Sequence, residues 1–134
     1  MKYFLDSSLL IALINNNDAL HSEAIKYKEL IKDNDCYISN LIINEVVTVI
    51  GNKLTLDISI KTYNLLNNLF IVINEYEYNN FNSNTMRIYE KYNTKLSFTD
   101  SAIINIMKEA NIENLISIDK EFKKEKGIKL IGLK

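Results

Sequence analysis

Four acidic residues lie either where an apolar segment meets a predicted helix or on the flank of one, and they are Asp6, Glu45, Asp100 and Asp119. Asp6 and Asp119 each follow an apolar, strand-like segment, whereas Asp100 opens an apolar, helix-like one. In an open sheet of parallel strands, the carboxyl ends of the strands share one edge, and ligands bind there. We therefore expect these acids to converge in space. Converged carboxylates are typical ligands of Mg²⁺ or Mn²⁺ in enzymes that act on phosphate esters.

Electrostatic repulsion indicates that such a cluster needs a cation. Two carboxylates about 5 Å apart repel each other by roughly 3 kcal/mol at an effective dielectric constant near 20. Without a counter-ion, four converged acids would have to bind protons in part. A divalent metal ion removes this cost, so the acidic cluster predicts Mg²⁺ or Mn²⁺ as the cofactor.

The segments that position these acids alternate between strand and helix patterns. We predict strands over residues 3–5, 36–38, 70–73, 115–118 and 128–131. We predict helices over residues 9–14, 19–32, 40–52, 58–69, 78–92, 97–110 and 120–126. Strands that alternate with helices indicate a central parallel sheet between two layers of helices, which is a three-layer α/β/α fold.

Length and composition fit a single domain that spans residues 1–134. The chain has 134 residues, 47% of them hydrophobic, which excludes a disordered chain. It has no apolar run near 18 residues and no basic, cleavable leader, so we expect neither a membrane span nor a signal peptide. The lone Cys36 excludes a disulfide within the chain and fits a reducing compartment, so we expect a cytoplasmic protein.

Three of the four acids also have a structural interpretation. Asp6 and Asp119 each follow a strand, where an Asp often only caps the next helix. Asp100 lies three residues after Ser97, the spacing of a capping box, although a carboxylate at a helix start can be catalytic as well. Glu45 is the least ordinary acid, because it lies at the edge of an apolar helix face and is expected to be half-buried.

Other constellations are missing or are expected to be structural. His21 is the only histidine, which argues against a histidine-based zinc site and against a ribonuclease with paired histidines. We expect His21 to lie at the surface and Cys36 to be a small buried residue. The remaining acids, Glu75 among them, are expected to be solvated. None of the three glycines lies in a phosphate-binding loop, which excludes nucleotide-binding motifs of that kind.

Four segments, taken in order, resemble the motifs of PIN domains, and specifically of VapC-type toxin ribonucleases. They are residues 4–13 (FLDSSLLIAL), 38–47 (ISNLIINEVV), 96–101 (LSFTDS) and 116–122 (ISIDKEF). The resemblance spans nearly the whole chain. Ser8 and Ile118 depart from the residue types that are usual at their positions, but neither departure removes a carboxylate.

The resemblance implies a metal-dependent endoribonuclease with a PIN-like fold, commonly a homodimer and often inhibited by an antitoxin protein. It implies that Asp6, Asp100 and Asp119 hold one or two Mg²⁺ or Mn²⁺ ions. Glu45 would bind a metal ion or orient the attacking water. Ser8 and Ser117 would hydrogen-bond the carboxylates from outside the metal site. RNA is the implied substrate, and no motif indicates which RNA is cut.

Two alternatives stay open at this point. One is a PIN-fold module that processes or binds RNA without being a toxin. The other is a phospho-receiver domain, which would need paired acids after the first strand, whereas Asp6 is followed by Ser7 and Ser8. Apolar residues on the helices after Asn17 and Thr55 also exceed what a small sheet must cover, so we expect a homodimer interface there. These residues are Tyr27, Leu30, Ile31, Leu65, Leu66 and Leu69.

Overall fold

The computed structural model describes residues 1–118 and 129–132. Within these residues, five parallel strands form one sheet in the order β3-β2-β1-β4-β5. The strands are β1 (Lys2–Leu5), β2 (Asp35–Ser39), β3 (Ile71–Ile73), β4 (Asn114–Ser117) and β5 (Lys129–Gly132). Receiver domains have the strand order 2-1-3-4-5, so the receiver alternative does not fit this sheet.

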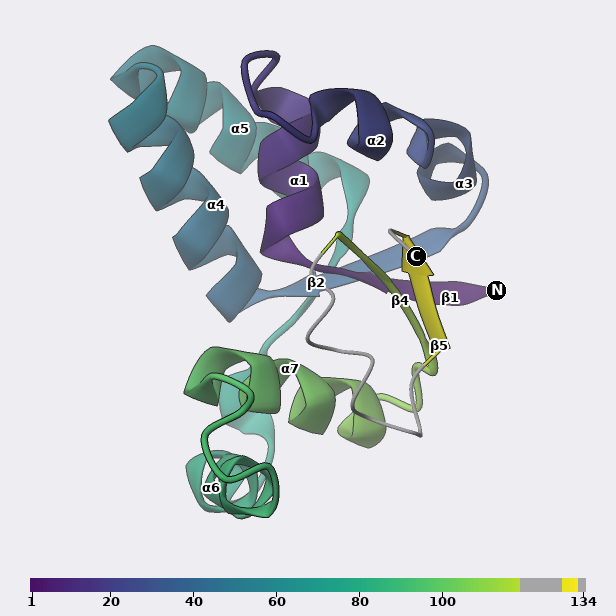
Figure 1. The fold of residues 1–134 in the computed structure, drawn as a ribbon, viewed down its shortest axis with the longest axis vertical. Coiled ribbons are helices and arrows are strands. Elements are labelled where there is room, and N and C mark those ends of the chain that lie inside the picture. Colours follow the sequence, from purple (N-terminus) through teal and green to yellow (C-terminus); the bar gives the residue numbers. More distant parts are fainter. Residues whose placement is uncertain (119–128, 133–134) are drawn as a thin grey trace.

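Helices cover both faces of the sheet. Figure 1 shows α1 to α5 on one face and α6 and α7 on the other, which confirms the predicted three-layer α/β/α fold. The helices on the first face are α1 (Ser7–Ile14), α2 (His21–Ile25), α3 (Lys28–Lys32), α4 (Asn40–Lys53) and α5 (Leu56–Leu69). After β3 come a short 3₁₀ helix, η1 (Glu75–Glu77), then α6 (Phe81–Lys91) and α7 (Phe98–Glu109). Within the described chain, no helix has both the length and the apolar character needed to cross a membrane.

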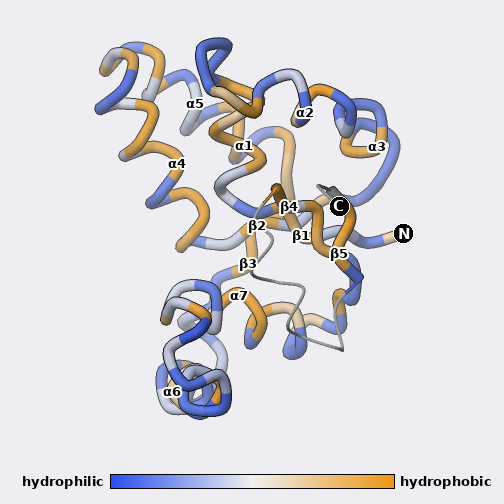
Figure 2. Tube along the Cα trace, viewed as in Figure 1, coloured by the Kyte–Doolittle hydropathy of each residue, from blue (hydrophilic) through white to orange (hydrophobic). Residues whose placement is uncertain are grey.

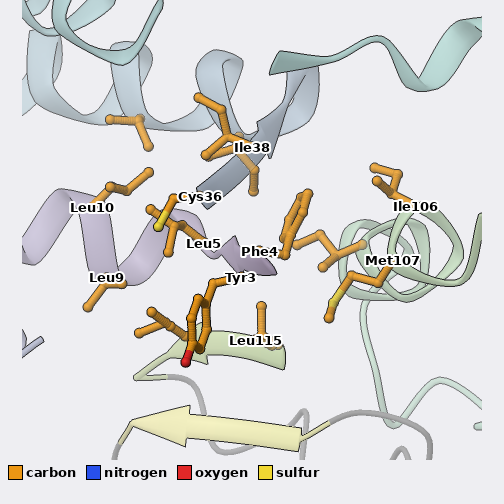
Figure 3. Close-up of a cluster of buried hydrophobic side chains, with 14 of the residues drawn as sticks. Tyr3, Phe4, Leu5, Leu9, Leu10, Cys36, Ile38, Ile106, Met107 and Leu115 are labelled. Atoms are coloured by element: carbon orange, nitrogen blue, oxygen red, sulfur yellow. The ribbon is translucent and has the colours of Figure 1, made fainter. Parts of the chain in front are cut away.

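The core lies on both faces of the central strand β1. Side chains of a strand alternate between the two faces, so Phe4 points toward Ile106 and Met107 of α7, while Leu5 lies on the side of α1 (Figure 3). Figure 2 shows the same division, with hydrophobic segments lining the inside of the layers. Phe4 and Leu5 are both fully buried, so packing holds the end of β1 in place, and with it the position of the next residue, Asp6.

The predicted helix over residues 19–32 is wrong in one respect, because the structure has two short helices there. The amides of Lys26 and Tyr27 bond to the carbonyl groups three residues earlier instead of four, so the α-helical ladder is interrupted between α2 and α3. Ala24 is the only buried residue of these two helices, so little packing holds a single long helix together.

The predicted helix over residues 78–92 begins later than expected, at Phe81. Asn80 has a φ angle of 55°, and this left-handed conformation cannot be part of a right-handed helix. Asp119 and the predicted helix over residues 120–126 lie outside the described residues.

Candidate active site

Asp6 lies at the carboxyl end of β1 and is held by three hydroxyl groups. Its side chain is 4% exposed. Its Oδ2 atom accepts hydrogen bonds from Ser117 Oγ at 2.6 Å and from Ser8 Oγ at 2.9 Å, and Ser7 Oγ lies 3.4 Å from its Oδ1 atom. Asp6 occupies the N-cap position of α1, as the cap interpretation expects, but its carboxylate makes no capping bond to that helix.

Ser117 reaches Asp6 because β1 and β4 are neighbours in the sheet. The amide of Asp6 bonds to the carbonyl group of Ile116 over 3.2 Å, which brings the ends of the two strands together. Ser8 belongs to the first turn of α1, directly after β1. The carboxylate is thus oriented by groups 2 and 111 positions away in sequence.

One pocket of about 380 Å³ brings Asp6 together with two of the other predicted acids. Its lining consists of Asp6, Ser7, Ser8, Glu45, Ser97, Thr99, Asp100 and Ile103. These residues come from the β1–α1 junction, from α4 and from the start of α7, so three separate segments of the chain build the pocket.

The other two acids of the pocket, Asp100 on α7 and Glu45 on α4, differ in their burial. Asp100 is half-buried in the first turn of α7, and its backbone N–H donates to Ser97 Oγ over 2.9 Å, the expected cap of that helix. The positive end of the helix dipole favours a negative charge at this position. Glu45 lies on α4 and is exposed, so the expectation that it is half-buried is wrong. It faces an open pocket and therefore needs no buried basic partner.

The pocket fits a divalent cation in the kind of donors it offers. Carboxylate and hydroxyl oxygens are the ligands that Mg²⁺ and Mn²⁺ prefer. Among the described residues, no group of three or more His, Cys, Asp or Glu side chains lies close enough together to hold a metal ion. Asp119, the fourth predicted acid, lies outside those residues, so the metal-binding roles of all four acids stay predictions.

Sequence reasoning missed Glu75, which was expected to be solvated and is fully buried. Its Oε1 and Oε2 atoms accept hydrogen bonds from the backbone N–H groups of Asn40 and Leu41, each at 3.0 Å. Glu75 therefore caps α4, the helix that carries Glu45. Ser39 occupies the usual capping position, but its buried Oγ has no hydrogen bond within the described part of the chain. The position of Glu75 shortly after a strand, similar to that of Asp6, was the signal that could have identified it.

His21 and Cys36 lie outside the acidic pocket. His21 was expected at the surface, but it is half-buried, and its Nδ1–H donates to the carbonyl oxygen of Ala12 over 2.6 Å. Cys36 is buried as expected. Burial, together with the negative charge of Asp35, raises the pKa of the Cys36 thiol to about 11. A thiol with such a high pKa is a poor nucleophile at neutral pH, so Cys36 is a core residue.

Several solved structures are similar to the chain. VapC20 of Mycobacterium tuberculosis, described as a sarcin–ricin loop cleaving toxin, has 17% identity and a TM-score of 0.78, and the match covers 91% of this chain and 93% of that one. VapBC2 of Rickettsia felis, bound to a DNA fragment from its promoter, has 16% identity, a TM-score of 0.75 and full coverage of both chains. A toxin–antitoxin complex from Klebsiella pneumoniae has 21% identity, a TM-score of 0.70 and 94% coverage of both chains.

These identities establish a shared fold, and a family model adds the family itself. A comparison with curated protein sequences finds no match. A family model described as the PIN domain matches residues 3–127, which includes the segments with Asp6, Glu45, Asp100 and Asp119. The resemblance inferred from the four motifs is confirmed at the level of the family and of the VapC fold. The chain belongs to the PIN domain family.

Proposed function

We propose that this protein is a metal-dependent endoribonuclease that hydrolyses phosphodiester bonds of RNA, and that it is the toxin of a toxin–antitoxin pair. One observation carries the proposal. The buried carboxylate of Asp6, oriented by serine hydroxyls, faces the same pocket as Glu45 and Asp100. Membership of the PIN family and the VapC fold support the same activity.

The four acids would hold Mg²⁺ or Mn²⁺ at this pocket, with Asp6, Glu45 and Asp100 on its wall and Asp119 expected beside them. The chemistry that a bound metal ion supplies is stabilisation of negative charge on the phosphate and a lower pKa for the attacking water. The net charge of −1 is unusual for a protein that binds RNA mainly through many positive charges. A cation at the acidic pocket gives the phosphate a local partner instead.

The protein's own residues orient the reactants. Ser8 and Ser117 hold Asp6 in one orientation by donating to its Oδ2 atom. The N-terminus of α7 helps to keep Asp100 ionised. Glu45, which is exposed, is free to orient the attacking water at its Oε atoms and to accept a proton from it.

The test is RNA cleavage by the purified protein in Mg²⁺ or Mn²⁺, with EDTA as the blank. Single-stranded and structured RNA should both be offered. We expect cleavage that stops in EDTA and returns when the metal ion is restored. Cleavage that persists in EDTA would contradict the metal dependence. RNA binding without any cleavage would favour the alternative, an RNA-binding or RNA-processing PIN module.

We also propose that the protein forms a homodimer through an apolar surface on one side of the sheet. A hollow of about 470 Å³ lies between α1, α2, α3 and α5. Beside it, Ile25, Leu65 and Leu69 are 45%, 46% and 62% exposed, and such contiguous apolar exposure usually marks an interface. Leu66, which we had included in this surface, belongs to the core with 1% exposure, while Tyr27, Leu30 and Ile31 are half-buried.

Light scattering at tens of micromolar tests the dimer. Wild type should have twice the mass of one chain, and Leu69→Glu should shift it toward the monomer. Asn67→Glu introduces the same charge on the opposite side of α5 and should leave the mass unchanged. A monomeric wild type would contradict the proposal.

An antitoxin is the second proposed partner, since structures with this fold include VapBC complexes from Rickettsia felis, Salmonella typhimurium and nontypeable Haemophilus influenzae. A small open reading frame with a DNA-binding pattern directly upstream of the gene would support it, and its product should inhibit cleavage when added.

We further propose that residues 1–134 form a single domain and that the protein is cytoplasmic, in keeping with the unpaired Cys36.

A further inference from the structure

A second hollow, separate from the apolar one between α1, α2, α3 and α5, continues from the acidic pocket along α4. It measures about 300 Å³, and it shares two lining residues, Glu45 and Thr99, with the acidic pocket. Its full lining is Leu41, Asn44, Glu45, Thr48, Val49 and Thr99. The residues from α4 are spaced three and four apart, so they lie on one face of that helix. The two hollows therefore form one groove between α4 and the first turn of α7.

The lining of this second hollow is mostly apolar, with a few polar side chains beside the apolar surface, so it suits a flat group that has a polar edge. Leu41 and Val49 offer half-buried apolar surface, whereas Asn44 and Thr48 are exposed and carry hydrogen-bonding groups. Within the described part of the chain, the side chains of Asn44 and Thr48 make no hydrogen bond, so their donors and acceptors can meet a ligand. Among the described residues, the lining contains no Lys or Arg that would pair with a phosphate, and no aromatic ring on which a base would stack.

A nucleobase is the part of an RNA chain that matches this lining. An amide offers both a donor and an acceptor, and a hydroxyl does the same, which is what recognition of a base edge requires. Thr48 lies three residues beyond Glu45, about 4.5 Å along the helix axis. A base held there belongs to a nucleotide next to the phosphate in the acidic pocket.

The shape of the hollow is fixed by contacts deeper in the structure. Leu41 lies in the first turn of α4, where its backbone N–H is held by the buried carboxylate of Glu75 over 3.0 Å. Thr99 lies in the first turn of α7, which is capped by Ser97. Both walls of the groove are thus set by helix ends with satisfied backbone groups, and the RNA meets a preformed site.

We propose that this hollow binds the base of the nucleotide next to the cut phosphate, and that Asn44 and Thr48 determine which base is preferred there. The inference rests on the proposed ribonuclease function and deepens it by naming what selects the cleavage site. Because no described residue of the lining offers a ring on which the base would stack, we expect selection to depend on hydrogen bonds to the edge of the base.

The test compares where wild type, Asn44→Ala and Thr48→Val cut a mixed-sequence single-stranded RNA in Mn²⁺, with the cut ends mapped by sequencing. Both substitutions remove hydrogen-bonding groups from exposed positions, so folding should survive, and matching melting curves verify this. The matched control is Asn52→Ala, an exposed asparagine on the same helix but outside both hollows.

We expect wild type and Asn52→Ala to prefer one base beside the cut. In Asn44→Ala and Thr48→Val, the ratio of cleavage next to that base over cleavage next to other bases should fall about tenfold, while both variants still cut RNA. If all four proteins cut with the same preference, or if wild type has none, the inference is overturned and the ribonuclease function stands. If wild type cuts no RNA in Mn²⁺, the proposed function fails, and the inference fails with it.

Discussion

The ends of two strands in one sheet each present a buried carboxylate, but the two carboxylates have different surroundings. Asp6 follows β1 and is 4% exposed, and Glu75 follows β3 and is 0% exposed. Glu75 uses both carboxylate oxygens on backbone N–H groups of α4. Asp6 accepts from serine hydroxyls and lies on the wall of a pocket that it shares with Glu45 and Asp100.

This difference separates a structural carboxylate from a candidate metal ligand. A carboxylate whose two oxygens are both taken by backbone groups stabilises a helix and has no open direction for a ligand. Hydroxyl groups orient a carboxylate and still leave lone pairs of its oxygens for a cation. Burial and position after a strand are common to both residues, so neither property alone identifies a catalytic acid.

The largest effect that would test this comparison is the loss of cleavage in Asp6→Asn and in Asp100→Asn. Each substitution keeps the size of the side chain and removes a charge from the pocket. We expect RNA cleavage to fall by about 10²–10³-fold or more, because metal affinity and transition-state stabilisation decrease together. Initial rates in Mn²⁺ measure this effect.

The matched control is Glu113→Gln, a change of the same type at an exposed loop acid outside the pocket, which should leave cleavage unchanged. Melting curves should show that both Asn variants remain folded. Wild-type rates in both Asn variants would show that the pocket is not the site of the reaction.

Much of this arrangement was predictable from sequence because its causes are local. The apolar segments set the strands and most of the helices. The shared edge of parallel strands predicted that distant acids converge, and Asp6, Glu45 and Asp100 line one pocket. The bond between Ser117 and a carboxylate was expected from the family resemblance, and Ser117 Oγ donates to Asp6 Oδ2, 111 positions away in sequence. The distance of 2.6 Å between the Ser117 and Asp6 oxygens follows from the pairing of β1 with β4, a strand order that the alternation of strands and helices does not specify.

The features that sequence did not predict depend on tertiary contacts, whose partners the local pattern does not specify. The partners of Glu75 are backbone N–H groups 34 and 35 positions earlier in the chain, and no side-chain pattern encodes them. The exposure of Glu45 depends on the open pocket beside α4, which periodicity cannot describe. The interruption between α2 and α3 reflects how few of their residues are buried.

The second prediction concerns the structural carboxylate. Glu75→Gln should lower the free energy of unfolding by about 1.5–3 kcal/mol, because one of two buried N–H groups loses a charged acceptor. Asp6→Asn should leave this free energy unchanged or slightly higher, since it removes like-charge repulsion from the pocket. Urea denaturation of both variants measures the difference.

Glu77→Gln is the control for Glu75, because it makes the same change at an exposed residue of η1 and should have little effect on stability. If Glu75→Gln is as stable as wild type, the carboxylate does not hold α4, and the contrast with Asp6 no longer stands.

A smaller effect is expected from the hydroxyl that orients Asp6. Ser117→Ala should lower metal affinity or cleavage by about 10–100-fold, the usual result of removing a group that orients a metal ligand. Ser59→Ala is the matched control, since Ser59 is also buried and donates one hydrogen bond, to the Leu56 carbonyl, away from the pocket. Equal cleavage by the two variants would mean that Ser117 has no role in the site.

The most direct measurement is the effect of Mn²⁺ on the thermal melting of wild type, Asp6→Asn and Glu75→Gln. At about 100 times its Kd, a ligand that binds only the folded state adds about 2.7 kcal/mol to the free energy of unfolding. We predict this stabilisation in wild type and in Glu75→Gln, and little or none in Asp6→Asn. Mn²⁺ that leaves wild type unchanged, or that stabilises Asp6→Asn as strongly as wild type, would contradict the assignment of the Asp6 pocket as the metal site.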